Sequence, residues 1–184
     1  GNCLINELDV LRIVVKRLES AGIPYMITGS TAANFYTTPR MTRDIDIVIE
    51  VGGENTETLF FLFASDFYID QDSIRNAIHN RQIFNIIHNE GIIKVDFIIK
   101  KETEYRKTEF QRRRSIVFEG LKMDIASPED LILSKLFWAK ESFSEMQIQD
   151  VKNLMRTVPD LDVNYIEKWL PGLGLEEIYK EANR

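Results

Sequence analysis

Apolar residues recur along the 184-residue chain at two spacings, which predict two kinds of element. From Leu8 to Leu18 they return every three or four positions, which is typical of a helix with one buried face, and Ala21-Gly22 would end it. Further helices are predicted over 30–36 and 57–63. Alternation and short apolar runs predict strands over 24–28, 44–49, 83–88, 92–99, 115–118 and 121–125.

Helical patterns replace strands after residue 125. Ser127 can cap the next helix, Pro128 suits its first position, and Asp130 completes a Ser-x-x-Asp capping pattern. Pro171-Gly172 is predicted to break the last helical region. The sequence therefore predicts an α/β (α+β) fold, with a mixed β-sheet flanked by helices in residues 1–125 and a C-terminal helical extension in residues 126–184.

Composition narrows the class of protein. No apolar run approaches the roughly 20 residues that cross a membrane, and Glu7 and Asp9 interrupt the first apolar positions, so we expect neither a membrane partner nor a signal peptide. Cys3 is the only cysteine, which indicates a reducing, cytoplasmic setting. The formal net charge of -6 does not favour nucleic acid as a partner, although a local basic patch could still bind it.

Basic residues gather between positions 100 and 114, directly after one predicted strand. One interpretation is that they hold an anionic acceptor. The other is that they lie on a solvated helix and pair with the interspersed glutamates. The cluster consists of Lys100, Lys101, Arg106, Lys107, Arg112, Arg113 and Arg114.

Gly29 and Ser30 lie where a predicted strand gives way to a predicted helix. The missing Cβ of Gly29 would let a phosphate approach the backbone, where free N–H groups and the positive end of the helix attract anions. Ser30 adds a hydroxyl donor. The alternative is that Gly29 only makes the turn and Ser30 only caps the helix.

Three aspartates lie on predicted strands. If the alternate isoleucines of 45–49 face the core, Asp44 and Asp46 lie together on the opposite face. Asp96 interrupts an apolar run, where an unpaired acid is costly. Carboxylates suit Mg²⁺, which takes oxygen ligands and is often shared with substrate phosphates. The pattern predicts a metal site of Asp44, Asp46 and Asp96 that serves a nucleoside triphosphate.

Together these motifs resemble the polymerase-β-like nucleotidyltransferase superfamily, and in particular its small bacterial single-domain members, which include the AbiE-type toxins of toxin–antitoxin pairs. The shared pattern is a Gly-Ser pair that opens a helix, an Arg-x-Thr-x-Asp-x-Asp strand that starts at Arg40, and the later Asp96. The segments 126–136 and 150–182 resemble the helices that follow the catalytic core. The resemblance implies a nucleotidyltransferase fold over most of the chain.

The resemblance also implies a reaction, in which a nucleoside monophosphate moves from a triphosphate donor to an acceptor hydroxyl and pyrophosphate is released. The cofactor would be Mg²⁺, with Mn²⁺ as the alternative. Catalysis and metal binding fall to Asp44, Asp46 and Asp96. Nucleotide binding falls to Gly29, Ser30, Arg40, Thr42 and Lys135, although Thr42 could instead brace the turn by hydrogen bonding.

Two helical residues have alternative interpretations. Lys135 lies on an apolar face, where its ammonium could reach the triphosphate or extend to solvent. Asp150 could orient Lys135 from a second shell, position an acceptor, or be a solvated acid. AbiE-type toxins commonly carry an acid three positions before the matching aspartate, and Gln147 stands there in this chain.

The sequence leaves the acceptor open among transfer RNA, a partner protein and a small hydroxylated molecule such as an aminoglycoside. A partner protein or a second copy of the chain could complete the acceptor pocket. The competing hypothesis is a catalytically silent binding module with this fold, acting as an antitoxin-like or regulatory partner.

Overall fold

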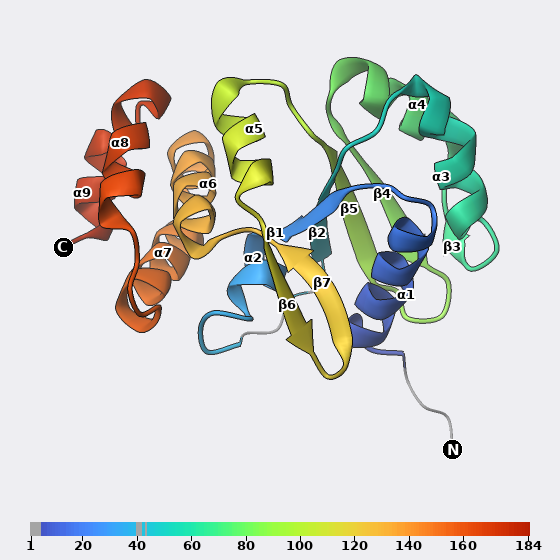
Figure 1. Cartoon of the computed structure of the whole chain (residues 1–184), viewed down its shortest axis with the longest axis horizontal. Helices are drawn as coiled ribbons and strands as arrows, with labels where there is room; N and C mark the ends of the chain where they lie inside the picture. The colour runs from blue at the N-terminus through green and yellow to red at the C-terminus, as the bar shows by residue number, and fades with distance from the viewer. Residues whose placement is uncertain (1–4, 40–41, 43) are drawn as a thin grey trace.

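A mixed sheet between two groups of helices forms the frame of the protein, seen in a computed structural model that describes residues 5–39, 42 and 44–184 (Figure 1). Within those residues the sheet has seven strands, in the order β3-β4-β5-β2-β1-β7-β6. The strands are β1 (Tyr25–Thr28), β2 (Asp44–Ile49), β3 (Phe67–Tyr68), β4 (Ile83–His88), β5 (Lys94–Ile99), β6 (Arg114–Phe118) and β7 (Leu121–Ile125).

Helices cover both sides of this sheet. Figure 1 shows α1, α3 and α4 on one side and α5 to α9 on the other. The helices are α1 (Glu7–Ser20), α2 (Gly29–Ala33), α3 (Thr56–Phe63), α4 (Gln71–Asn80), α5 (Glu104–Gln111), α6 (Pro128–Ser142), α7 (Glu145–Thr157), α8 (Val163–Leu173) and α9 (Glu176–Ala182), with a 3₁₀ turn, η1 (Gly53–Asn55). None of the helices in the described residues is long and apolar enough to cross a membrane.

The central strands separate an apolar face from an acidic one. Along β2, Ile45, Ile47 and Ile49 are fully buried, whereas Asp44 is exposed and Asp46 half-buried. β5 alternates in the same way, and its Phe97 packs against Phe63 of α3. The predicted alternation is therefore confirmed. Because the apolar residues face α1 and α3, the acids face the side of α5 and α6.

The predicted strands are all present, but three details differ. α4 and the two-residue β3 were not predicted, although Ile74, Ala77 and Ile78 of α4 recur at helical spacing after the cap residue Asp70. The helix predicted over 30–36 is shorter than expected: it ends at Ala33, and turns follow it. The break predicted at Pro171-Gly172 is wrong, because α8 runs to Leu173 and ends only at Gly174, whose φ is +67°. A proline in the last turn removes a single helical hydrogen bond, so the helix tolerates it.

A buried carboxylate joins the sheet region to the C-terminal helices. Asp130 of α6 is completely buried and accepts hydrogen bonds from the Ser127 hydroxyl at 2.7 Å, the Tyr165 hydroxyl at 2.7 Å and the Arg112 Nε at 3.2 Å. The predicted cap is confirmed, since the Asp130 N–H donates to Ser127 Oγ at 3.1 Å. The Tyr105 hydroxyl of α5 is a further donor, at 3.2 Å.

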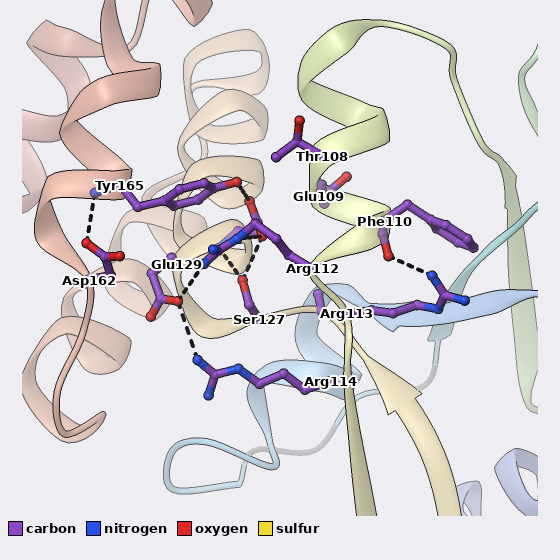
Figure 2. A network of polar contacts seen from close by, with 12 residues as sticks. Thr108, Glu109, Phe110, Arg112, Arg113, Arg114, Ser127, Glu129, Asp162 and Tyr165 are labelled. Carbon is purple, nitrogen blue, oxygen red and sulfur yellow. Dashed lines mark hydrogen bonds and ion pairs between the residues drawn. The ribbon is translucent and has the colours of Figure 1, made fainter.

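Arg112 completes this junction (Figure 2). It follows α5, donates to Glu129 of α6 at 3.0 Å, and stacks over the ring of Tyr165 of α8, with 3.6 Å between the guanidinium carbon and the ring centroid. Residues on both sides of the predicted boundary at 125–126 thus share one polar network. The division into 1–125 and 126–184 stays a prediction, and this network leads us to expect that the two parts unfold together.

We expect Asp130→Asn to lower the free energy of unfolding by about 3 kcal/mol, because the neutral amide removes one of the two buried carboxylates that pair with Arg112 and points N–H groups at hydroxyl donors. Urea unfolding followed by circular dichroism measures this. The control is Asp160→Asn, the same chemical change at an exposed position, which should cost less than about 0.5 kcal/mol. A loss below about 1 kcal/mol for Asp130→Asn would contradict the role assigned to the network.

Candidate active site

Gly29 brings the backbone against one of the aspartates. It follows β1 with a φ of +63°, a conformation that favours glycine, and a Cβ at this position would collide with the carboxylate of Asp46. Thr28, just before it, is the direct partner of Asp46 on the neighbouring strand. The structure thus requires glycine at position 29 for two reasons, and places Ser30 directly beyond it.

Asp46 and Asp96 form a carboxyl pair. β2 and β5 run parallel with these residues in register, so both side chains lie on one face and a hydrogen bond joins them. The pKa of Asp46 is raised to about 7. Burial is the main cause, and the nearby negative charges of Asp96 and Asp44 add to it. Burial also raises the pKa of Asp96. The proton shared by the pair therefore lies on Asp46.

Asp44 lies at the edge of the pair, with a side chain that is 53% exposed. The Lys94 ammonium lies 3.8 Å from an Asp44 oxygen and 3.5 Å from an Asp96 oxygen, so it supplies positive charge to the acids. The sequence analysis missed Lys94, although period two places it on the same face as Asp96. Among the described residues, no three side chains of His, Cys, Asp or Glu are close enough together to hold a metal ion.

Lys135 is buried beside the Gly29 turn. Its ammonium donates to Asp150 Oδ2 at 2.8 Å, to Gln147 Oε1 at 3.1 Å and to Ser30 Oγ at 3.4 Å. Its exposed fraction is 3%, so the ammonium does not extend to solvent, and Asp150 is also buried rather than solvated. The contact through which Asp150 could orient Lys135 is therefore present.

Thr42 holds the start of β2. Its hydroxyl donates to the Asp44 carbonyl at 3.0 Å and accepts from the Asp44 N–H at 3.3 Å. These are the hydrogen bonds that a bracing role requires, whereas the nucleotide-binding role stays a prediction. Arg40, predicted to contact phosphate, lies outside the described residues.

Five of the predicted residues open onto one cavity of about 630 Å³, whereas Asp44, Thr42 and Asp150 do not line it. Gly29, Ser30, Asp46, Asp96 and Lys135 all line it, between the acidic face of the sheet and helices α5 and α6. Such a volume is typical of small-molecule sites. Gln147 also lines this cavity, a position that the sequence analysis had noted only as a departure from the toxins.

The carboxylates suit a divalent cation in donor type and charge. Three acids lie near the Lys94 ammonium, and Asp46 keeps its proton to a pKa of about 7, chiefly because it is buried and also because Asp96 and Asp44 place negative charge beside it. A divalent cation would replace that proton and neutralise the remaining charge. The donor set therefore fits Mg²⁺ or Mn²⁺ in type and charge, and Asp44 would have to turn toward the Asp46–Asp96 pair for the three residues to hold the ion together.

No protein-family model matches the chain, and no curated protein matches it in sequence. Solved structures do resemble it. An antigenic nucleotidyltransferase-like protein from Paracoccidioides brasiliensis is 20% identical, with a TM-score of 0.54 over 94% of this chain and 89% of that protein. LnuA, a lincosamide antibiotic adenylyltransferase solved with lincomycin, is 14% identical, with a TM-score of 0.56 over 83% and 98%.

A third similar structure is ANT(2")-Ia, solved in complex with adenylyl-2"-tobramycin. It is 14% identical, with a TM-score of 0.57 over 89% of this chain and 94% of that protein. At such identities the likeness shows the fold. The chain therefore has the nucleotidyltransferase fold, which confirms the α/β architecture that the sequence resemblance implied, while the connection to AbiE-type toxins stays a prediction.

Gly29→Ala should destabilise the protein by about 1 to 3 kcal/mol, because alanine disfavours the positive φ and its Cβ displaces Asp46. Thermal unfolding checks this against Gly172→Ala, where the new Cβ meets open space within a helix. That control should be neutral or stabilising by up to about 1 kcal/mol. Equal melting temperatures for the two variants would argue against the close approach at Gly29.

The Asp46 proton should make stability depend on pH. Between its unfolded pKa near 4 and its folded pKa of about 7, the folded protein binds a proton that the unfolded chain has lost, so the free energy of unfolding falls as pH rises. From pH 5 to 8 this group should contribute a fall on the order of 2 kcal/mol, after a discount for partial exposure. Urea unfolding at several pH values should show a smaller fall in Asp46→Asn, and an identical profile would contradict the assignment.

Proposed function

We propose that the protein is a metal-dependent nucleotidyltransferase that moves a nucleoside monophosphate from a triphosphate donor to an acceptor hydroxyl. One observation carries the proposal above all others. The Asp46–Asp96 pair, the Gly29 turn and Lys135 come from separate parts of the sequence and meet in one cavity. The fold shared with adenylyltransferases such as LnuA and ANT(2")-Ia supports the same reaction class.

The phosphate chain of the donor is assigned to the end of the cavity near Gly29. There the Ser30 hydroxyl lies beside the Lys135 ammonium, which brings a positive charge to that end. Asp150 fixes the Lys135 ammonium on one side, which lowers the entropy cost of contacting phosphate. The other partner of Lys135, Gln147, is neutral. Lys135, Asp150 and Gln147 together therefore carry less negative charge than they would with an acid at position 147.

Metal binding is assigned to Asp44, Asp46 and Asp96. Bound Mg²⁺ or Mn²⁺ supplies Lewis acidity at the α-phosphate and neutralises charge on the departing pyrophosphate. Asp46 must lose its proton for this, and its pKa of about 7 permits that near neutral pH. Lys94 lies beside Asp44 and Asp96, so its ammonium would move as the acids turn to the cation.

In the proposed transfer, one bond to phosphorus forms as another breaks, and a carboxylate takes up the proton that is released. The acceptor oxygen forms a bond to the α-phosphorus as the bond from that phosphorus to the oxygen leading to the β-phosphate breaks. Pyrophosphate leaves with the electron pair, and the hydroxyl proton passes to a carboxylate, for which Asp96 is the candidate. The triphosphate donor is consistent with a cytoplasmic reaction.

Calorimetry with each of the four nucleoside triphosphates, with and without magnesium, tests this function. We expect magnesium-dependent binding of at least one of them, weakened about tenfold or more by Asp44→Asn. The melting temperature should stay the same, because the Asp44 side chain is largely exposed. Asp72→Asn, an exposed acid on α4 outside the cavity, is the matched control and should bind like the wild type.

Two outcomes would overturn parts of this proposal. If the wild type binds no nucleoside triphosphate, the protein is better explained as a binding module with this fold. If Asp44→Asn keeps full magnesium-dependent affinity, the metal assignment is wrong.

A further inference from the structure

The cavity has a second end, which is basic. Lys100 and Lys101 follow β5, Arg81 precedes β4, and Arg106 lies on α5, and all four line the cavity that contains Asp96. Because a strand rises about 3.3 Å per residue, Lys100 lies about 13 Å along the chain from Asp96. Lys100 and Lys101 are therefore well separated from Asp96, whereas Arg106 reaches α6 and donates to Ser134 Oγ at 3.2 Å.

Acids behind the cavity hold two of these cations in place. Arg81 donates to the Lys100 carbonyl at 3.1 Å and pairs with Glu102 at 3.4 Å. Lys100 pairs with Glu50 at 2.6 Å and with Glu102 at 3.8 Å. Neither glutamate lines the cavity. Arg81 and Lys100 thus line the space, whereas the acids that pair with them lie outside it.

Arg106 and Lys101 differ in their pairing. Arg106 pairs with the buried Glu109 at 3.0 Å, and both residues line the cavity, so the charge of Arg106 is offset there. Lys101 is exposed, and no hydrogen bond or ion pair joins its ammonium to another residue in 5–39, 42 or 44–184. Its charge is available to a ligand.

An apolar section separates the two ends. Val48 and Ile98 follow the two aspartates on the same face of the sheet, and Phe137 and Trp138 of α6 line the cavity as well. The two aromatic residues are 36% and 51% exposed, which is high for rings beside a cavity. Rings in such a position can cover a ring or an apolar body of a ligand.

A nucleoside triphosphate does not account for the basic end. All of its negative charge is on the phosphate chain, and that chain is assigned to Ser30 and Lys135 at the opposite end. The donor therefore leaves the basic end to another molecule, and in particular Lys101, which is unpaired within the described part of the chain. The other substrate of a transferase is its acceptor.

We propose that the acceptor is a small hydroxylated molecule with an anionic group, a carboxylate or a phosphate monoester, which binds Arg81, Lys100, Lys101 and Arg106. This inference rests on the proposed function and specifies its substrate class. The body of the acceptor packs along the apolar section, with its hydroxyl at the aspartates. A polycationic acceptor of the tobramycin type is disfavoured here by like charge.

The test is an NMR titration of the whole protein with inorganic phosphate, without nucleotide or magnesium. We expect saturable shifts of the backbone amides of 81–83 and 99–101, distinct from those of 29–31 at the donor end. The double variant Arg81→Gln/Lys101→Gln should raise the apparent Kd at this site about tenfold. The matched control Arg75→Gln/Lys107→Gln makes the same charge change outside the cavity and should leave this Kd unchanged.

Phosphate shifts confined to 29–31, or the same Kd in both double variants, would overturn the inference. So would tobramycin binding at the basic end more tightly than phosphate. Competition by a short oligonucleotide but not by a sugar phosphate would replace it with a polynucleotide acceptor. Because no nucleotide is used, loss of this site leaves the donor calorimetry intact. Failed donor binding beside a working phosphate site would refute the proposed function, and with it the acceptor role, while the anion site would stand.

Discussion

The structure of the site depends on holding like charges close together. Asp46 and Asp96 are direct partners on parallel strands, and each is partly removed from water, so their simultaneous ionisation is unfavourable. The protein offsets this with a proton on Asp46 and with the Lys94 ammonium beside Asp96. A site that must retain a proton and an ammonium to be stable is one that a divalent cation can stabilise further. Gly29 then confines Asp46 from the other side, so the carboxylate has little freedom to turn away.

The same parallel register accounts for the two ends of the cavity. Both strands run from their aspartates toward their carboxyl ends, so the residues that follow them gather at one place, and the turn at Gly29 stays with the acids. Lys100 and Lys101 lie beyond β5 for this reason, and the antiparallel β4 brings Arg81 to meet them. Charge is therefore distributed along the strand direction, with acids and the donor end at one side and cations at the other.

Period two and helix signals were enough to predict most elements, because each depends on neighbours in sequence. They placed the three aspartates on the correct face and the cap at Ser127. They could not pair Asp46 with Asp96, since register between strands 50 residues apart is a tertiary property. The position of Arg81 in the cavity could not be predicted for the same reason. The sequence also could not show that the basic cluster has two locations. Lys100, Lys101 and Arg106 line the cavity, whereas Arg112 belongs to the α6–α8 junction.

That junction bears on chemistry as well as on stability. Asp130 fixes the first turn of α6, and Lys135 lies five residues later, about 7.5 Å along the helix. The position of the Lys135 ammonium relative to Asp46 is therefore set by contacts that Asp130 makes with α5 and α8, some distance from any substrate. A site that must hold phosphate between a lysine on one part and aspartates on the other needs the two parts rigidly joined, since small displacements weaken charge-assisted hydrogen bonds steeply. On this reasoning the helical extension helps to build the candidate site, and Asp150 on α7 is the partner that lets α6 carry the buried Lys135 ammonium into it.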